Sequence, residues 1–345
     1  MQPNEKAKAS WGAGAPGSEA PQRPPVRDLA ISIINYRTAE MTIACARTVL
    51  DAIAGLDAHV VITDNFSDDG SDAILQAFVE ALGPDAPVTL ALSPVNTGFS
   101  GGHNIGIRAA KARFYLLFNS DAELHAGAPQ ALLARAAADP KAGIIGCRLE
   151  YDDGQMQDSC FRFPGPKSEL MRGAQTGFVT KAFLDRWVVM EMPPSGPVEW
   201  LSFASVMLRA EMIEAIGMMD EGFFLYSEDT EYCWRARQNG WDVVWEGGAR
   251  AIHHRGGSSD AKEKAAEKKR VPPYVYASRS RLMAILHGGA AGLLLCNLAW
   301  LAGRAITHLR LLGGRRPVPA MQNEARDVWI NALDPYGDPR KPKGA

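Results

Sequence analysis

The sequence predicts an α/β fold with a mostly parallel sheet flanked by helices, and three observations lead to this class. Short apolar runs alternate with helical stretches between residues 29 and 121, as in units where a helix connects two parallel strands. The polar motifs of this region each follow an apolar run, and ligands of such sheets bind at the carboxyl ends of strands. The composition, 46% hydrophobic and 22% charged residues, is that of an ordinary globular protein.

The individual elements follow from the apolar periodicity of the sequence. Strands are predicted at residues 29–34, 59–63, 88–92, 114–118, 143–149, 200–208 and 243–245. Helices are predicted at residues 44–50, 73–81 and 105–112 and from Ser227 onward. Residues 164–197 contain several Pro and Gly residues, and we expect them to form loops that frame a substrate site.

The flanks and the overall composition restrict the function further. Residues 1–27 are rich in Pro, Gly, Ala and charge without the apolar segment of a signal peptide, which predicts a disordered tail. The net charge of −2 argues against a general nucleic-acid binder. The five cysteines form no C-x-x-C pair, so we expect buried thiols in a reducing cytoplasm rather than a zinc site or disulfides.

Asn-Ser-Asp at positions 119–121 follows an apolar run, so Asp121 is expected at the edge of the sheet. A hard divalent cation such as Mg²⁺ or Mn²⁺ takes oxygen ligands and leaves positions open for substrate phosphates. A turn closed by Asn and Asp side chains explains the same pattern. The motif alone leaves both interpretations open.

Residues 96–106 read Asn-Thr-Gly-Phe-Ser-Gly-Gly-His-Asn-Ile-Gly. Glycines allow the backbone to approach a ligand closely, and the N-terminus of a following helix offers free N–H groups to an anion. The spacing does not match the G-x-G-x-x-G fingerprint of dinucleotide-binding proteins. A purely structural strand-to-helix turn is the alternative.

Two further motifs carry titratable side chains. Ser227 at a helix start, acidic residues in the first turn and a Glu231–Arg235 pair would stabilise a helix. The alternative gives Asp229 the role of a general base. His253 follows a predicted strand and is either a metal ligand or an ordinary packed histidine.

The order of these motifs resembles that of the family 2 glycosyltransferases over residues 29–259. The rhamnosyltransferase-like and galactofuranosyltransferase-like branch is the most similar. The motifs that carry the resemblance are Ile-Ser-Ile-Ile-Asn-Tyr at 31–36, Thr-Asp-Asn-Phe-Ser-Asp-Asp-Gly-Ser at 63–71, the Gly-rich segment at 96–106, Phe-Asn-Ser-Asp at 118–121, the acidic segment at 220–235, and His253.

The resemblance implies a nucleotide-binding domain of the GT-A type at residues 28–260. It assigns donor contacts to six residues, with Asp64 against the nucleobase: Asn35, Asp64, Asn96, Gly98, Asn104 and Asn119. It further implies that Asp121 and His253 hold Mg²⁺ or Mn²⁺, and that Asp229 is the catalytic base. Phe203 departs from the family's usual glycine, and its ring is expected to narrow the sugar pocket.

The implied activity is a metal-dependent, inverting transfer of a sugar from a nucleotide-diphosphate donor. The sugar is transferred to a hydroxyl of a saccharide or of a lipid-linked acceptor, in the synthesis of bacterial surface polysaccharides. Branch resemblance favours rhamnose, with galactofuranose and other hexoses open. A non-catalytic protein that binds nucleotide sugars is the alternative from another class.

Residues 261–316 form a basic appendage, followed by a C-terminal tail at 317–345. The appendage contains eleven Lys and Arg residues against two Glu residues. Its apolar stretch, residues 288–303, is shorter than the roughly 20 residues that span a bilayer. One interpretation is a helix on an anionic membrane surface, peripheral on the inner face of the cell membrane. The other is helices that pack on the catalytic domain with solvated charges.

Overall fold

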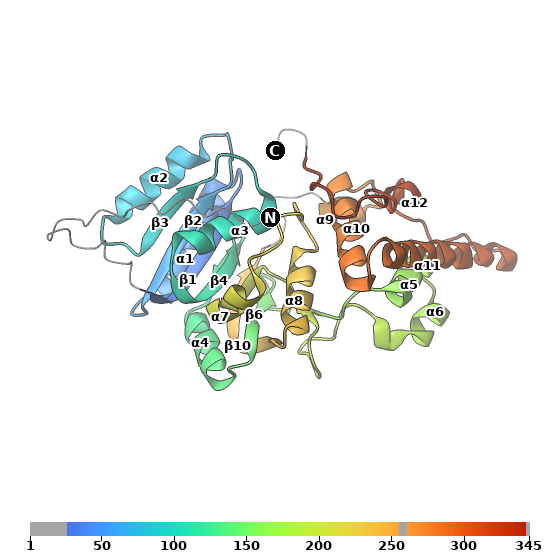
Figure 1. Cartoon of the computed structure of the whole chain (residues 1–345), viewed down its shortest axis with the longest axis horizontal. Coiled ribbons are helices and arrows are strands. Elements are labelled where there is room, and N and C mark those ends of the chain that lie inside the picture. The colour runs from blue at the N-terminus through green and yellow to red at the C-terminus, as the bar shows by residue number, and fades with distance from the viewer. Residues whose placement is uncertain (1–25, 255–260, 343–345) are drawn as a thin grey trace, which may run out of the picture.

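The computed structural model describes residues 26–254 and 261–342 and contains an eight-stranded sheet covered by helices (Figure 1). The strand order is β3-β2-β1-β4-β9-β6-β10-β5. Most of the tail expected at residues 1–27 lies outside the described residues, and its last residue, Arg27, already begins strand β1. The mostly parallel α/β sheet that the sequence predicts is therefore confirmed.

The first half of the chain follows the predicted alternation closely. Its elements are β1 (Arg27–Asn35), α1 (Ala39–Ala52), β2 (Ala58–Asp64), α2 (Ser71–Leu82), β3 (Val88–Leu92), α3 (Gly98–Ala109) and β4 (Ala112–Asn119). β1 pairs in parallel with β2 and with β4, and β2 pairs in parallel with β3. Apolar side chains that alternate along these strands fill the core on both faces, since Leu116 and Leu117 are both 0% exposed.

The second half completes the sheet with strands of mixed direction. Its main elements are β5 (Ala122–Leu124), α4 (Ala128–Ala138), β6 (Ala142–Glu150), β9 (Ser205–Arg209), α7 (Ala210–Ile216), α8 (Glu228–Gln238) and β10 (Asp242–His253). β9 lies antiparallel between β4 and β6, and β6 pairs in parallel with β10.

Two strand predictions need correction. The single strand expected at 200–208 is two strands, because β8 (Trp200–Leu201) pairs with β7 (Cys160–Phe161) in a separate small sheet. The strand expected at 243–245 continues to His253 through an irregularity in its pairing between Glu246 and Arg250. The five cysteines are all buried and free, as expected.

The prediction of loops at residues 164–197 is wrong for much of that segment. It folds into α5 (Pro166–Ala174), α6 (Gly177–Ala182) and the short 3-10 helix η1 (Leu184–Arg186). Proline is favoured in the first turn of a helix, so Pro166 marks a start rather than a break. Met171 and Ala174 of α5 and Val179 of α6 are buried in a cluster with Ile306 of α11, a partner that local sequence patterns do not identify.

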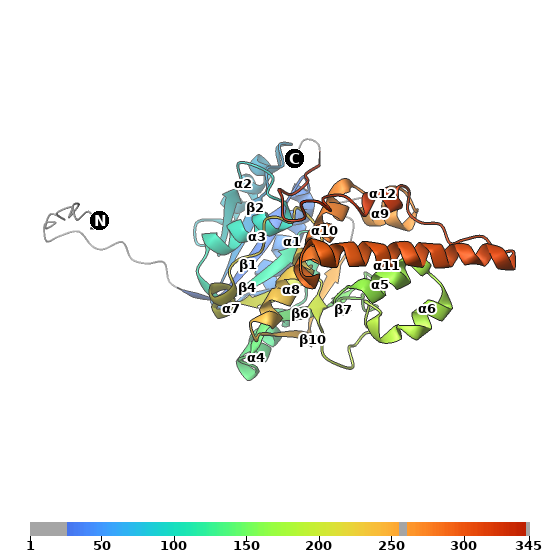
Figure 2. The ribbon, with the colours of Figure 1, turned by 45° about the vertical axis from the view of Figure 1, so that its right-hand side comes forward.

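The C-terminal appendage is helical. It consists of α9 (Ala261–Ala266), α10 (Pro273–His287), α11 (Ala290–His308) and η2 (Leu309–Gly313), and the short helix α12 (Glu324–Asp327) lies in the C-terminal tail. Figure 2 shows α11 running along α5 and α6 at the edge of the molecule. The helical run Ala290–Gly313 is 24 residues long. By length and composition alone it is therefore sufficient for a membrane span, unlike the shorter apolar stretch expected from the sequence.

Glycine contacts and ion pairs join the appendage to α5. A Cβ atom at Gly303 would lie 2.3 Å from the carbonyl oxygen of Leu170, so α11 meets α5 at backbone distance. The buried carboxylate of Glu169 binds Arg172 from its own helix and Arg279 from α10. Arg172 also pairs with Glu324 of α12. Arg279 of the appendage thus binds a protein partner, as do Arg270, which pairs with Asp327, and Arg281, which pairs with Asp220.

Candidate active site

The carboxyl ends of the principal strands lie at one edge of the sheet. β9 is antiparallel to both β4 and β6, so β6 and its parallel neighbour β10 run in the same direction as β1, β2 and β4. Asn35, Asp64, Asn119 and His253 are the last residues of β1, β2, β4 and β10. The strand directions alone therefore bring these four distant positions to the same edge.

Asp121, His253 and Asn119 meet at this edge. β5 pairs antiparallel with β10 so that Ala122 lies opposite His253. The Nε2 atom of His253 lies 3.3 Å from an Asp121 carboxylate oxygen and 3.4 Å from Nδ2 of Asn119. The backbone N–H of His254 donates to the carbonyl of Asp121 at 2.9 Å, which holds the two strands in this register.

Gln157 is buried behind this group and was not anticipated from the sequence. Its side-chain amide donates to the backbone carbonyl of His253 at 2.6 Å and to that of Glu150 at 2.8 Å. Both contacts fix backbone rather than side chains. Nothing in the local pattern around Gln157 indicates this role, because its partner lies 96 positions away.

The side chains of Asp121 and His253 suit a divalent cation that accepts both oxygen and nitrogen ligands. Both are largely buried, with side-chain exposures of 12% and 7%. Within residues 26–254 and 261–342, no group of three or more His, Cys, Asp or Glu side chains is arranged to hold a metal. The pair therefore fits a cation that takes its remaining ligands from substrate oxygens and water.

The carboxylate of Asp64 is held by a fixed set of hydrogen bonds. It accepts from Nδ2 of Asn35 at 2.7 Å and from Oγ of Ser67 at 2.5 Å. The other side-chain atom of Asn35, Oδ1, accepts from the hydroxyl of Thr42 at 2.8 Å. Asn35 is 0% exposed, so it positions Asp64 rather than presenting its amide to solvent.

Asn65 links this turn to the Gly-rich segment. Its Nδ2 donates to the carbonyl of Gly98 at 2.9 Å and to Oδ1 of Asn96 at 3.2 Å, and its Oδ1 accepts from the N–H of Thr97 at 3.0 Å. The side chains of Asn65 and Asn96 are buried. The Asp-Asn pair at 64–65 carried a signal for this role, because an amide beside a strand end has both donors and an acceptor to offer.

The Gly-rich segment is mostly helix, not a loop. α3 begins at Gly98, seven positions before the predicted start. A Cβ atom at Gly102 would lie 2.8 Å from Cδ1 of Ile34, and one at Gly106 would lie 2.2 Å from Oγ of Ser32. These two glycines thus allow α3 to pack directly on β1, which favours the structural explanation for them.

Gly98 itself has a different role. Its φ of +70° is in the region that favours glycine, and a Cβ atom there would lie 2.0 Å from the carbonyl oxygen of Phe224. The N–H of Phe99 donates to that same carbonyl at 2.9 Å, and the N–H of Gly98 donates to Asn96 at 2.9 Å. Two of the first amides of α3 thus already have protein acceptors, which reduces the N–H groups left for an anion.

Asn104 holds the segment before α8 onto α3. Its Nδ2 donates to the carbonyl of Met219 and to the carboxylate of Glu221, both at 2.9 Å, and its Oδ1 accepts from the N–H of Met219. The residue is 1% exposed. In this geometry Asn104 sets the path of the chain toward Asp229.

Asp229 lies in the first turn of α8, and α8 packs against β10, the strand that ends at His253. Oδ1 of Asp229 accepts from the N–H of Thr230 at 2.7 Å. Ser227 occupies the N-cap position but makes no side-chain capping hydrogen bond, contrary to the expectation, whereas the predicted Glu231–Arg235 pair is confirmed at 2.9 Å. Tyr226 and Ser227 both have positive φ, at 69° and 74°. Such strain is common next to functional residues.

Glu228, beside Asp229, has an unusual environment. Burial raises the pKa of its carboxyl group well above the ordinary value, and the charge of Asp229 raises that pKa further. One carboxyl oxygen of Glu228 has no hydrogen-bond partner. Glu228 therefore retains its proton to a higher pH than an ordinary glutamic acid.

Phe203, which was expected to narrow the sugar pocket, lies within the core. Its ring is 2% exposed and packs edge-on against Tyr232 with 6.3 Å between centroids. The Phe203 ring therefore packs against α8 and does not line an exposed pocket.

Comparisons with known proteins show what the chain is similar to. Residues 30–180 match the family described as Glycosyl transferase family 2. Over 218 residues the chain is 29% identical to the N-acetylglucosaminyl-diphospho-decaprenol L-rhamnosyltransferase of Mycobacterium tuberculosis, covering 58% of this chain and 67% of that protein. It is also 29% identical to the O-antigen biosynthesis protein RfbC of Myxococcus xanthus over 168 residues, which are 46% of this chain and 12% of that protein.

Solved structures show the same fold. The mannosyltransferase PcManGT from Pyrobaculum calidifontis, in complex with GDP-Man and Mn²⁺, superposes with a TM-score of 0.51 at 14% identity. The match covers 93% of this chain and 85% of that one. Residues 30–180 therefore match a family 2 glycosyltransferase domain, and the chain has the GT-A fold of these glycosyltransferases.

Proposed function

We propose that this glycosyltransferase moves a sugar from a nucleotide-diphosphate donor to a hydroxyl acceptor in a single displacement that inverts the anomeric carbon. The observation that carries the proposal is the contact of Asp121 with His253 at 3.3 Å, at the same sheet edge as Asp64. These side chains come from separate parts of the sequence. Their convergence at the carboxyl ends of strands is the arrangement that a nucleotide-sugar site requires.

In this mechanism Asp64, held by Asn35 and Ser67, binds the nucleobase. Asn96, Gly98 and Asn119 then contact the rest of the donor. A divalent cation, Mg²⁺ or Mn²⁺, held by Asp121 and His253 would supply positive charge to neutralise the departing diphosphate.

Asp229 removes the proton from the acceptor hydroxyl as the new bond forms. Because its pKa is raised, Glu228 keeps its proton to a higher pH than an ordinary glutamic acid. It therefore does not place a second full negative charge beside Asp229 until the pH is higher. Asn104 contributes by positioning, since it holds the segment that precedes α8.

The donor is proposed to carry rhamnose, with galactofuranose or another hexose as the alternative. The rhamnosyltransferase of M. tuberculosis supports this choice, and its name describes a polyprenol-linked saccharide acceptor. We therefore propose a lipid-linked saccharide acceptor in cell-surface polysaccharide synthesis, and a position on the inner face of the cell membrane.

The test has two stages. A panel of nucleotide sugars is first screened for thermal stabilisation of the full chain with Mn²⁺ present, since a ligand that binds only the folded state raises its melting temperature. The stabilising donor is then assayed for transfer to saccharide acceptors, with and without Mn²⁺. Transfer that requires Asp229 supports the proposal. Donor binding without transfer or hydrolysis would assign the chain to the non-catalytic binders instead.

A further inference from the structure

The helix α11 is largely apolar on its outward face as well as on its inward face, unlike an ordinary surface helix. A helix on a soluble domain turns its apolar side chains inward and its polar ones to solvent. α11 buries Asn297 and Thr307 beside Leu293, Cys296 and Trp300, and most of its exposed side chains are apolar as well. The outward face includes Leu294, Leu295, Leu298, Ala302, Ala305 and His308, and Leu309 of η2 continues it.

The buried polar groups of α11 are bound within the protein. Asn297 accepts from Arg279 at 2.8 Å and donates to the carbonyl of Val328 at 3.0 Å. Arg304, the helix's one Arg or Lys, donates to the carbonyl of Val318 at 2.7 Å. The inward face is therefore fixed by specific contacts, and α11 cannot rotate to bury its leucines.

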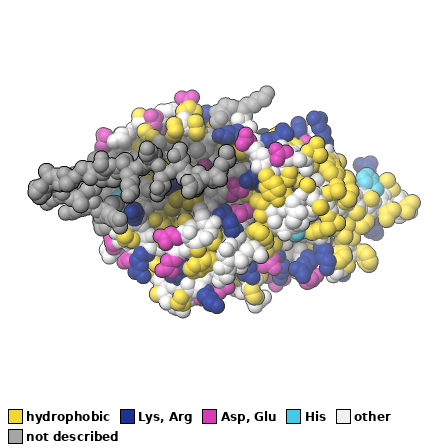
Figure 3. All heavy atoms as spheres, viewed as in Figure 1, with side chains coloured by type: hydrophobic (Ala, Val, Ile, Leu, Met, Phe, Trp, Pro, Cys, Tyr) yellow, Lys and Arg dark blue, Asp and Glu magenta, His cyan; other side chains and the backbone are white. Residues whose placement is uncertain are grey.

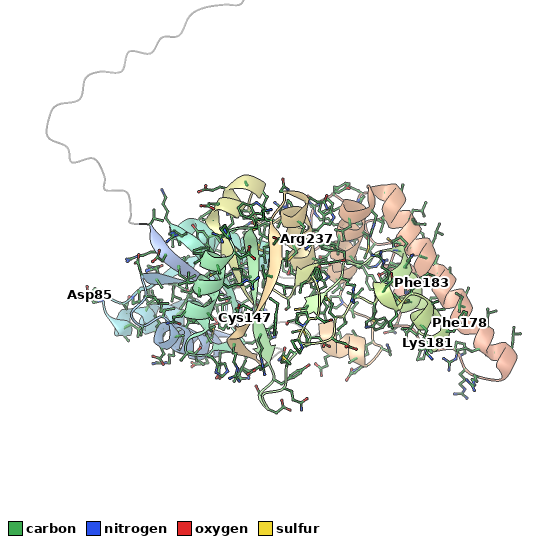
Figure 4. The ribbon with its side chains drawn as sticks, turned by 90° about the horizontal axis from the view of Figure 1, so that it is seen from below. Asp85, Cys147, Phe178, Lys181, Phe183 and Arg237 are labelled. Carbon is green, nitrogen blue, oxygen red and sulfur yellow. The ribbon has the colours of Figure 1, made fainter. Side chains whose placement is uncertain are left out.

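A second element extends this apolar face. α6 and η1 pack beside the C-terminal part of α11, where Val179 and Phe183 contact Ile306. Phe178 is 83% exposed and Leu184 is 62% exposed. Figure 4 shows Phe178, Lys181 and Phe183 together at the end of the molecule beside α11. In Figure 3 hydrophobic side chains cover the same end of the molecule.

The charge around this surface is mostly positive, and the exposed Asp185 of η1 is paired with its neighbour Arg186 at 3.2 Å. No Asp or Glu occurs in the sequence from residue 268 to residue 323. Leu311 and Leu312 of η2 are exposed, and the exposed Arg315 and Arg316 follow after two glycines. Lys181 is exposed on α6. Basic side chains therefore border the leucines of α11 and η2.

We propose that the outward face of α11, together with α6, η1 and η2, docks in the plane of an anionic lipid bilayer. Apolar side chains bordered by Arg and Lys match the boundary between acyl chains and anionic headgroups. A second copy of the chain would bring the same basic groups together, so it fits less well. The inference rests on the proposed function in one respect: the membrane contact would bring the active site to a lipid-linked acceptor.

The geometry favours a helix that lies in the membrane surface over one that spans it. Gly303 meets the backbone of α5, and Arg279 connects α11 to the buried Glu169. Withdrawing α11 into a bilayer would break the contact of Arg279 with Asn297 and carry the polar side chains of Asn297 and Arg304 away from their protein partners, at a cost in free energy. The 24-residue helical run therefore serves as an in-plane anchor.

The experiment is vesicle flotation of the full chain without donor, acceptor or metal. Vesicles of phosphatidylcholine alone are compared with equal mixtures of phosphatidylcholine and phosphatidylglycerol. The wild type is expected to float with the mixed vesicles and to bind the neutral ones at least about tenfold more weakly. Failure to float with mixed vesicles, or equal binding to both, would overturn the proposal.

Paired substitutions test each part of the surface. Leu294→Gln with Leu298→Gln should weaken binding to mixed vesicles by at least about tenfold, since each leucine loses its apolar burial. Phe178→Gln with Leu184→Gln should weaken vesicle binding in the same way. Unchanged binding by this variant would contradict the contribution of α6 and η1. Ile74→Gln with Leu82→Gln, on α2, is the matched control and should bind like wild type.

Two further measurements separate the alternatives. If sedimentation shows a dimer that Leu294→Gln with Leu298→Gln dissociates, and the wild type does not bind vesicles, the face belongs to a second copy and the proposal fails. Transfer to a soluble saccharide acceptor should be the same in this variant and in wild type. Because flotation requires no turnover, a failure of the proposed activity leaves the flotation result unaffected.

Discussion

The sheet built by β1 to β4 and the helical end built by α5, α6, α10 and α11 are stabilised in different ways. In the sheet, apolar strands alternate with helices and polar side chains gather at the strand ends. At the helical end, glycines bring backbones together and buried ion pairs join helices distant in the sequence. Regular local patterns specify the first region, whereas a few long-range contacts specify the second.

The largest expected effect concerns the chemistry at the strand ends. Replacing Asp121→Asn should lower kcat/KM for transfer by about a thousandfold or more, because the carboxylate that faces His253 is lost. Steady-state assays across Mn²⁺ concentrations measure this loss. Asp85→Asn, at an exposed loop, is the control and should keep wild-type activity. If Asp121→Asn retains full activity, its proposed role is wrong.

The next effect tests the glycine contact at the helical end. Gly303→Val should destabilise the packing of α11 on α5 by about 3 kcal/mol or more, since its Cβ would meet the backbone of Leu170. Hydrogen exchange should rise in α5 and α11 while β1 to β4 stay protected. Gly177→Ala has open space around its Cβ position and serves as the control. A uniform rise across the whole chain would contradict separate stabilisation of the two regions.

Acid should weaken the helical end through Glu169. Burial alone would raise the pKa of this carboxyl, but Arg172 and Arg279 more than offset that effect and lower it to about 2. A lowered pKa contributes stability that is present above the unfolded value of 4.5 and is lost as pH falls toward 2. The contribution is on the order of 3 kcal/mol.

Urea unfolding of wild type and of Glu169→Gln across this pH range measures the contribution as a difference. The variant should be less stable at neutral pH and should lose less stability on acidification. Glu191→Gln, at an exposed position, should follow wild type. Parallel pH curves for Glu169→Gln and wild type would show that the ion pairs contribute nothing.

The smallest effect is at the start of α8. Because Ser227 makes no side-chain capping bond, Ser227→Ala should change the free energy of unfolding by less than about 0.5 kcal/mol, instead of the ~1 kcal/mol typical of a capping serine. Ser227→Gly should stabilise by up to about 1 kcal/mol, because φ is +74°. Chemical denaturation resolves the two, and a large loss on Ser227→Ala would indicate a capping role after all.

The sequence predicts the sheet region well because its information is local. Strand β3 has its predicted bounds, and the motifs that begin at Asp64 and Asn119 lie at the carboxyl ends of strands as expected. The helical start at Gly98 was missed, because a run rich in glycine disfavours helix unless tertiary packing requires it. Here the packing of Gly102 and Gly106 on β1 provides that requirement.

The helical end was predicted poorly for the same physical reason. α5 and α6 are short, and short helices depend on tertiary partners for their stability. Those partners lie on α11, as in the contact between Gly173 and Trp300. The roles proposed for Asn35 and Asn104 also depend on partners, since their hydrogen bonds reach Asp64 and Met219 across 29 and 115 positions.

The antiparallel pairing of β5 with β10 has a consequence for the order in which the protein is made. Asn119 and His253 are 134 positions apart, and only β10 brings them together. The segment that matches the family, residues 30–180, ends before both Asp229 and His253. A growing chain on the ribosome thus acquires strands β1 to β4 first and the contacts of His253 with Asn119 and Asp121 only after residue 253 has emerged.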